Sequence, residues 1–148
     1  MDDGQLVTGV AVSAVGRLTG YWDVSASYQH LDARLRTQNA ANDGNWLTLT
    51  PERAGSLWTT FQLPLSLRLG GGLRYTDQVY VNAANTIVVP AYTLADLLFE
   101  APLGDRLMLR LNVYNVTDKR YVKSINNNGA RYNPGAPRSI LFTTGVRF

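Results

Sequence analysis

The chain has 148 residues, no cysteine and a formal net charge of +3. The absence of cysteine excludes disulfide scaffolds, thiolate metal sites and cysteine nucleophiles. The basic residues are scattered at strand-like spacings and form no continuous stripe, which argues against binding to nucleic acid. No run approaches the roughly 18 consecutive apolar residues of a membrane helix, so any membrane contact has to use strands.

The N-terminal residues 1–5 are acidic, and neither a basic region nor a long apolar core follows them. This pattern is not that of a secretory signal peptide. Either the chain stays inside the cell, or its true start lies further upstream.

Seven segments alternate apolar and polar residues with the period of two that is typical of a β-strand. They are residues 9–17, 22–34, 56–63, 65–75, 92–101, 107–114 and 139–148. The sixth segment is expected to run on towards Tyr121. In residues 65–75, two arginines and two glycines share a face that no dry core would accept. That face is expected to meet water, and the opposite face lipid.

The connections between these segments alternate between short and long. The long ones are residues 36–55, 78–90 and 123–137. Aromatic residues stand near the ends of the apolar faces: Trp22, Tyr28, Phe61, Tyr75, Phe99 and Phe148. These features predict an all-β fold, namely an antiparallel up-and-down transmembrane β-barrel segment. A meander of seven strands cannot close with antiparallel neighbours, so the chain is expected to be part of a larger barrel or to borrow strands from other copies.

The stretch LNVYNVTDKRY at residues 111–121 resembles the strand near the C-terminus of TonB-dependent outer-membrane receptors, especially siderophore receptors. Other pieces agree with that family in the same order. They are GRLT at 16–19, WDVSASY at 22–28, LWTT at 57–60, GLRY at 72–75, AANT at 83–86, PAYTLAD at 90–96, GAPR at 135–138 and the final Phe148. The resemblance therefore spans nearly the whole chain.

The resemblance implies that residues 1–148 are the C-terminal portion of such a barrel in the bacterial outer membrane. The signal peptide, the plug domain and the TonB box would lie upstream. The short turns would face the periplasm and the three long connections the outside. The implied partners are a ferric siderophore, the receptor's own plug domain, the TonB energy-coupling complex, outer-membrane lipid and the barrel-assembly machinery, which would read Phe148 as its signal.

Four residues of the long connections are candidates for contact with a ferric siderophore: Trp46, Arg53, Arg131 and Tyr132. Aromatic faces and guanidinium groups suit a bulky chelate that is anionic or neutral. The alternative interpretation of the same residues is packing within the loops and contact with lipopolysaccharide.

Five charged residues on strands are expected to face the lumen or the plug: Arg68, Arg74, Asp96, Glu100 and Arg110. Asp96 and Glu100 are too far apart along their strand to share a proton, so ion pairs with arginines on neighbouring strands are the expected arrangement. The only histidine, His30, has no acidic pair at ligand spacing and is expected to be a surface or interface residue and not part of a metal site. The three glycines at 70–72 are expected to relieve crowding against a plug or to permit strand curvature.

The favoured hypothesis is an active transport receptor for ferric siderophores, with no cofactor of its own and with iron only as part of the substrate. The alternative is a small self-assembling or truncated barrel without transport activity. An enzyme is disfavoured because the sequence has no Ser/His/Asp constellation around its single histidine. A soluble lipocalin-like binder would require apolar residues to point inward and charges outward.

Overall fold

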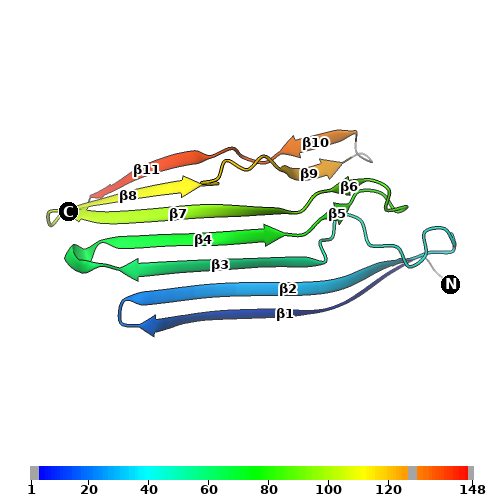
Figure 1. The fold of residues 1–148 in the computed structure, drawn as a ribbon, viewed down its shortest axis with the longest axis horizontal. Helices are drawn as coiled ribbons and strands as arrows, with labels where there is room; N and C mark the ends of the chain where they lie inside the picture. Colours follow the sequence, from blue (N-terminus) through cyan, green and yellow to red (C-terminus); the bar gives the residue numbers. More distant parts are fainter. Residues whose placement is uncertain (1–3, 127–129, 147–148) are drawn as a thin grey trace.

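The structure is a computed structural model that describes residues 4–126 and 130–146. Most of these residues form one antiparallel sheet in which strand order follows chain order, β1-β2-β3-β4-β7-β8-β11 (Figure 1). The strands are β1 (Gly4–Thr19), β2 (Trp22–Arg36), β3 (Arg53–Gln62), β4 (Arg68–Thr76), β7 (Tyr92–Leu103), β8 (Leu107–Tyr114) and β11 (Ser139–Val146). No helix in this part of the chain is both long and apolar enough to cross a membrane.

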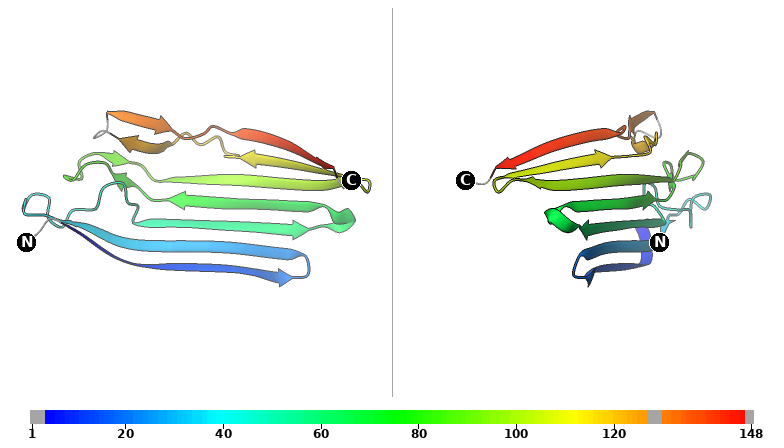
Figure 2. Two further views of the ribbon diagram at one scale, coloured as in Figure 1. Left: turned by 180° about the vertical axis from the view of Figure 1, so that it is seen from behind. Right: turned by 60° about the vertical axis from the view of Figure 1, so that its left-hand side comes forward.

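Two small hairpins stand beyond the main sheet, one in each of two long connections. They pair β5 (Val79–Tyr80) with β6 (Val88–Val89), and β9 (Val122–Asn126) with β10 (Arg131–Pro134). All three long connections leave the sheet at the same end, and the three short ones lie at the other end (Figure 2). This segregation confirms the predicted up-and-down arrangement.

One face of the sheet is apolar from edge to edge, because register partners in an antiparallel pair point to the same side. We call it the apolar face. A row of large side chains crosses it towards the short connections. Its successive register partners are Trp22, Phe61, Leu69, Phe99, Leu111 and Phe142. The rings of the first two stack at 5.4 Å between centroids.

A second row crosses the apolar face towards the long connections and includes two tyrosines, Tyr28 and Tyr75, on either side of Gly55. Aliphatic side chains fill the band between the two rows, and Leu73 among them is 50% exposed. Tyr28 lies six positions after Trp22, which is about 20 Å along a strand. An aliphatic band of this kind with aromatic residues at both margins is typical of the outer surface of a transmembrane barrel.

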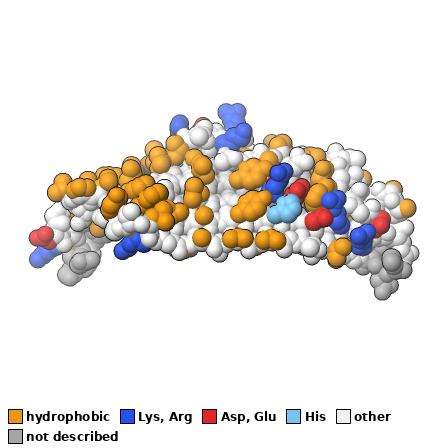
Figure 3. All heavy atoms as spheres, turned by 60° about the horizontal axis from the view of Figure 1, so that its bottom comes forward, with side chains coloured by type: hydrophobic (Ala, Val, Ile, Leu, Met, Phe, Trp, Pro, Cys, Tyr) orange, Lys and Arg blue, Asp and Glu red, His pale blue; other side chains and the backbone are white. Residues whose placement is uncertain are grey.

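The same side of the sheet becomes charged beyond the Tyr28 row. Along β2 beyond Tyr28, the next side chains on this side are His30, Asp32 and Arg34. His30 is the register partner of Arg53 on β3. Figure 3 shows hydrophobic side chains gathered over the half towards the short connections and a charged group with the histidine over the other half. The change marks where the apolar band ends.

The opposite face, the polar face, carries small and charged side chains together with Trp58, Leu94 and Leu98. One of its rows includes Ser13, Ser27, Ser56 and Arg74. Another runs through Gln62, Arg68, Glu100, Arg110 and Thr143. The sequence prediction of two faces in different environments is therefore confirmed in register as well as in composition.

Several predicted boundaries were wrong. Residues 64–66 form a single 3₁₀ turn, in which Leu65 has φ +61° and is 85% exposed, so the fourth strand begins at Arg68 and not at residue 65. The sixth strand ends at Tyr114 and does not run on to Tyr121, because Asn115 adopts φ +50° and starts a turn. Positive φ ends strand geometry in both places.

Both lateral edges of the sheet are open. β1 pairs only with β2 and β11 only with β8, and the two edge strands run in the same direction (Figure 1). They cannot therefore pair with each other in the antiparallel manner of the rest of the sheet.

Candidate sites on the polar face and at the long connections

Two carboxylates on β7 are held by arginines from the neighbouring strands. Arg74 on β4 donates from Nη2 to Oδ2 of Asp96 at 2.8 Å, and Glu100 lies between Arg68, at 3.5 Å, and Arg110 on β8. The carboxylate side chains are only 12% and 10% exposed, while the three arginine side chains are 42–56% exposed. The predicted cross-strand ion pairs are therefore present, with the guanidinium groups at the surface of the polar face.

Asp96 also fixes the start of the last long connection. Its Oδ1 accepts a hydrogen bond at 2.8 Å from the backbone N–H of Asn115, a residue that is 3% exposed. The Asn115 amide in turn donates to the carbonyls of Lys119 and Ala136 and accepts the N–H of Lys119. The turn that ends β8 is thus tied both to the sheet and to the chain just before β11.

The glycines of β4 make room for a tryptophan of the same sheet. A Cβ at Gly72 would collide with the Trp58 ring and would lie 2.7 Å from the carbonyl of Leu57, and a Cβ at Gly70 would lie 3.3 Å from that ring. In the structure, Trp58 and the Leu57 carbonyl occupy the space beside Gly72, whereas Thr60, Leu98 and Trp58 together border Gly70. Nearby, a groove of about 390 Å³ crosses β1 to β4 and is lined by small polar residues such as Ser13, Ser27 and Ser56, with Arg74 at its margin.

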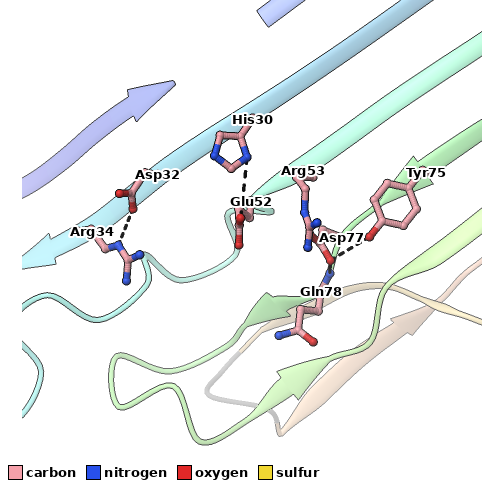
Figure 4. A network of polar contacts seen from close by, with 8 residues as sticks. All are labelled: His30, Asp32, Arg34, Glu52, Arg53, Tyr75, Asp77 and Gln78. Atoms are coloured by element: carbon pink, nitrogen blue, oxygen red, sulfur yellow. Dashed lines mark hydrogen bonds and ion pairs between the residues drawn. The ribbon is translucent and has the colours of Figure 1, made fainter. Parts of the chain in front are cut away.

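Figure 4 shows the charged group beyond the Tyr28 row. His30 Nδ1 lies 3.8 Å from Glu52, and Arg34 pairs with Asp32. Arg53 donates to Asp77 at 2.8 Å. The histidine side chain is 49% exposed, which agrees with the surface position predicted for it.

Asp77 is the most buried acid of this group, at 8% exposed. Burial by itself raises the pKa of its carboxyl, but the N–H of Gln78, the guanidinium of Arg53 and the hydroxyl of Tyr75 stabilise the ionised form more. The pKa of Asp77 is therefore lowered below its ordinary value.

The first two long connections are clamped together. Asn85 accepts the N–H of Trp46 at 2.7 Å and donates to the Trp46 carbonyl at 3.0 Å. Asn45 donates to the carbonyl of Ala83, and the N–H of Leu49 to the carbonyl of Tyr80. Asn85 adopts φ +53°, a conformation that asparagine tolerates better than most residues.

The four predicted ligand residues separate into two pairs. Trp46 and Arg53 line one cavity of about 250 Å³. Trp46 lies opposite Arg34 with the guanidinium 3.6 Å from its ring centroid. Arg53 is not a loop residue as predicted, because the sheet register extends β3 back to pair it with His30. Both side chains are thus engaged in contacts on the side of the sheet that carries the apolar band.

Arg131 and Tyr132 lie on β10, far along the chain from the first pair, and both are exposed. Tyr132 is 64% exposed and lines a separate cavity of about 470 Å³. Phe148 lies outside the described residues.

Sequence reasoning missed Asn85, Asn115 and Asp77 as organising residues. The only available signal was asparagine or aspartate at the margin of a strand, which favours turns.

The comparisons with known proteins agree with this architecture. The sequence profile described as TonB dependent receptor-like, beta-barrel matches residues 3–116. The chain is 36% identical over 148 residues to the catecholate siderophore receptor Fiu of Escherichia coli K12, and the match covers 96% of this chain and 20% of that protein. It is 33% identical over 126 residues to the probable TonB-dependent siderophore receptor PiuA of Acinetobacter baumannii, with 78% of this chain and 17% of that protein covered.

Solved structures are similar over nearly the full chain. The crystal structure of PiuA from A. baumannii matches with a TM-score of 0.87 at 29% identity, covering 97% of this chain and 22% of that one. The closed form of Fiu from E. coli K12 matches with a TM-score of 0.85 at 33% identity, covering 97% of this chain and 21% of that one.

The chain spans about a fifth of the length of these relatives. The profile match covers most of the chain, and the seven-stranded sheet has the same fold as the corresponding part of the solved receptors. The chain therefore belongs to the TonB-dependent receptor β-barrel family of the bacterial outer membrane.

Proposed function

We propose that this chain is the C-terminal wall segment of an outer-membrane receptor that actively takes up a ferric siderophore. The relatives it resembles are named as siderophore receptors, and they are about five times as long. The plug domain, the TonB box and the contact with the TonB complex would belong to parts of the receptor outside these residues.

The observation that carries the proposal is a sheet with two different faces and two open edges. The apolar band between aromatic rows suits lipid, and the ion-paired face suits water. Unpaired edge groups in lipid would cost several kcal/mol each, so β1 and β11 need further strands beside them. A larger barrel would supply those strands. Closure of this sheet on itself would not, because β1 and β11 run in the same direction.

The polar face would then line the lumen and meet the plug. The exposed groups on this face include the guanidinium groups of Arg68, Arg74 and Arg110. They form ion pairs with the more buried carboxylates of Asp96 and Glu100. The serine-lined groove beside Arg74 offers hydroxyl groups to a plug segment. Because the ion pairs already hold the arginine side chains in place, binding of the plug would cost little side-chain entropy.

The ligand would be met at the long connections, which would face outside. Three of the four predicted residues are exposed, namely Arg53, Arg131 and Tyr132, but the Arg53 guanidinium is bound to Asp77. Arg131 and Tyr132 would therefore be the residues available for such contact. Trp46 and Arg53 would instead hold the first two connections in place. The barrel-assembly machinery would read the C-terminal Phe148.

The test is uptake of radioactive iron by cells that lack their own siderophore receptors and express the full-length receptor containing this chain. We expect uptake of a ferric siderophore only when both the receptor and TonB are present. A receptor that reaches the outer membrane but transports no ferric siderophore would contradict the proposal. A product that exists only at 16.3 kDa in the outer membrane would favour the small self-assembling barrel.

A further inference from the structure

The turn that ends β8 is held by a side chain of the neighbouring strand. We call residues 115–119 the Asn115 turn. Beyond the last register pair between β7 and β8, the Asp96 carboxylate takes the place of a backbone acceptor, because its Oδ1 accepts the N–H of Asn115 at 2.8 Å. The N–H of Val116 donates to the carbonyl of Ala95, also at 2.8 Å. Two consecutive N–H groups therefore tie the turn to β7, and a side chain accepts one of them.

The same carboxylate is bound by a guanidinium group on the polar face. Arg74 donates to Oδ2 of Asp96 from Nε at 3.1 Å and from Nη2 at 2.8 Å. One carboxylate oxygen thus serves Arg74 and the other serves the N–H of Asn115. The Asp96 side chain is 12% exposed, whereas the Arg74 side chain is 56% exposed. An anion that binds Arg74 from the polar face therefore acts on a carboxylate that it does not itself touch.

Loss of Arg74 from this pair would loosen the turn. A nearly buried carboxylate is costly to keep ionised without its cation, so the Asp96 side chain would turn towards water. The N–H of Asn115, a residue that is 3% exposed, would then lose its acceptor, and a buried N–H without an acceptor is unfavourable. The bond from Val116 to β7 would remain, so the turn would loosen and not detach.

The other ion-paired carboxylate of β7 provides a comparison. Glu100 pairs with Arg68 and Arg110 and lies four positions further towards the short connections. In the part of the chain that the structure describes, its carboxylate accepts no N–H from a connection. The Arg68 side chain is 42% exposed, so it is open to a partner in much the same way as that of Arg74. The two arginines differ in whether their carboxylate also holds a turn.

We propose that Asp96 couples the polar face to the rim of the long connections, so that a carboxylate of the plug that binds Arg74 draws it from Asp96 and loosens the Asn115 turn. The inference rests on the proposed function, in which the polar face lines the lumen. It adds a partner for Arg74 and a route through the wall. The partner carries a carboxylate because a half-exposed guanidinium group fits a second carboxylate well. Coupling is reciprocal, so a turn held firmly in place favours the Arg74–Asp96 pair and weakens the hold of Arg74 on the plug.

The test is hydrogen exchange, measured by mass spectrometry on the full-length receptor. It is read in peptides of the Asn115 turn and of the plug, and peptides of β2 serve as the check of folding. Ser56 is the register partner of Arg74, so Ser56→Asp places a competing carboxylate beside Arg74 and imitates the plug. Gln62 is the register partner of Arg68 on the same two strands, so Gln62→Glu is the matched control with the same change of charge. A second matched pair is Arg74→Gln and Arg68→Gln.

We expect Ser56→Asp and Arg74→Gln each to raise the exchange of the Asn115 turn about tenfold, and Gln62→Glu and Arg68→Gln to leave it unchanged. Ser56→Asp added to Arg74→Gln should raise it no further, because the guanidinium group through which it acts is gone. Arg74→Gln should also raise the exchange of one segment of the plug, and Arg68→Gln should leave that segment protected.

An Asn115 turn that responds equally at both arginine sites, or at neither, would overturn the inference, and so would additive effects in the double variant. A plug that responds to neither arginine would overturn its assignment as the partner of Arg74. The uptake assay separates these failures from that of the proposed function. A receptor that transports a ferric siderophore while the Asn115 turn fails to respond overturns the inference alone. A receptor that transports none overturns the proposed function and, with it, the plug as the partner of Arg74.

Discussion

Asp96 is the residue on which the polar face and the last long connection both depend. Its carboxylate receives Arg74 from one side and the buried N–H of Asn115 from the other. We expect Asp96→Asn to lower the free energy of unfolding of the receptor by about 1–3 kcal/mol, since a neutral amide cannot satisfy both donors equally well.

The loss of the folded, fast-migrating band on heating in denaturing gels measures this effect. Asp23→Asn is the matched control, because the Arg17–Asp23 pair has side chains 66% and 37% exposed and should matter little. Equal melting of the two variants would show that the Asp96 network contributes no more than a surface ion pair.

Gly72 is a residue whose importance comes from a neighbour and not from its own conformation. Any Cβ there collides with Trp58. We expect Gly72→Ala to destabilise the barrel by about 1–3 kcal/mol by overpacking, and Trp58→Ala in the same chain to recover part of the loss. Gly16→Ala, where a Cβ meets nothing within 4 Å, should leave stability unchanged in the same heating assay. Failure of the Trp58 substitution to recover any stability would contradict the assigned cause.

At this scale the sequence alone predicted ion pairs between the carboxylates of β7 and Arg68, Arg74 or Arg110, and the structure confirms such pairs. It did not predict which arginine pairs with which carboxylate, because that depends on the register between the strands. It could not predict that Trp58 lies over Gly70 and Gly72. That contact depends on the register between β3 and β4. Alternation alone does not fix this register, because a shift of two residues keeps every side chain on the same face.

At the scale of elements, one side chain supplies two of the four hydrogen bonds described above between the first two long connections. Asn85 makes both hydrogen bonds to the Trp46 backbone. We expect Asn85→Ala to release residues 45–49 and to raise their hydrogen exchange and protease sensitivity about tenfold, with the strands unaffected. Asn42→Ala, in the first long connection with residues 45–49, serves as the control. An equal rise in the hydrogen exchange of residues 45–49 in both variants would contradict a specific role of Asn85.

The second connection should respond to acid through Asp77. Its pKa is lowered from an ordinary 3.8, so its ionised form stabilises the fold at pH values above about 4. That contribution is lost as the pH falls through the lowered pKa. We therefore expect residues 77–91 to become protease-sensitive in that acidic range, and Asp77→Asn to be sensitive already at neutral pH. A wild-type connection that stays equally protected under acid would contradict the role of Asp77.

The strands were predictable from the sequence because alternation is a strong signal over eight or more residues. The limits of β4 and β8 were not, because a 3₁₀ turn at residues 64–66 and the positive φ of Asn115 interrupt patterns that still alternate in sequence. The β5–β6 and β9–β10 hairpins were missed for a related reason. Strands of two to five residues are too short to show a period.

At the scale of the whole molecule, the chain is a wall with a lipid side, a water side and two edges that need neighbours. The odd number of strands in the sequence predicted that the two edges need other strands as neighbours. In the structure β1 and β11 run in the same direction and so cannot pair with each other in an antiparallel manner. The position of the last long connection on the polar-face side could not be predicted from the sequence, because it depends on the contacts of Tyr121 with Tyr92 and of Asn115 with Asp96.

The most direct test of the account is the environment of successive side chains along β2 in the full-length receptor. This segment has no native cysteine, so a nitroxide can be attached at residues 24–28 one position at a time. We predict high collision rates with lipid-dissolved oxygen at Val24, Ala26 and Tyr28, and low rates at Ser25 and Ser27. A flat profile, or one with its maxima at the two serines, would contradict a transmembrane wall with these two faces.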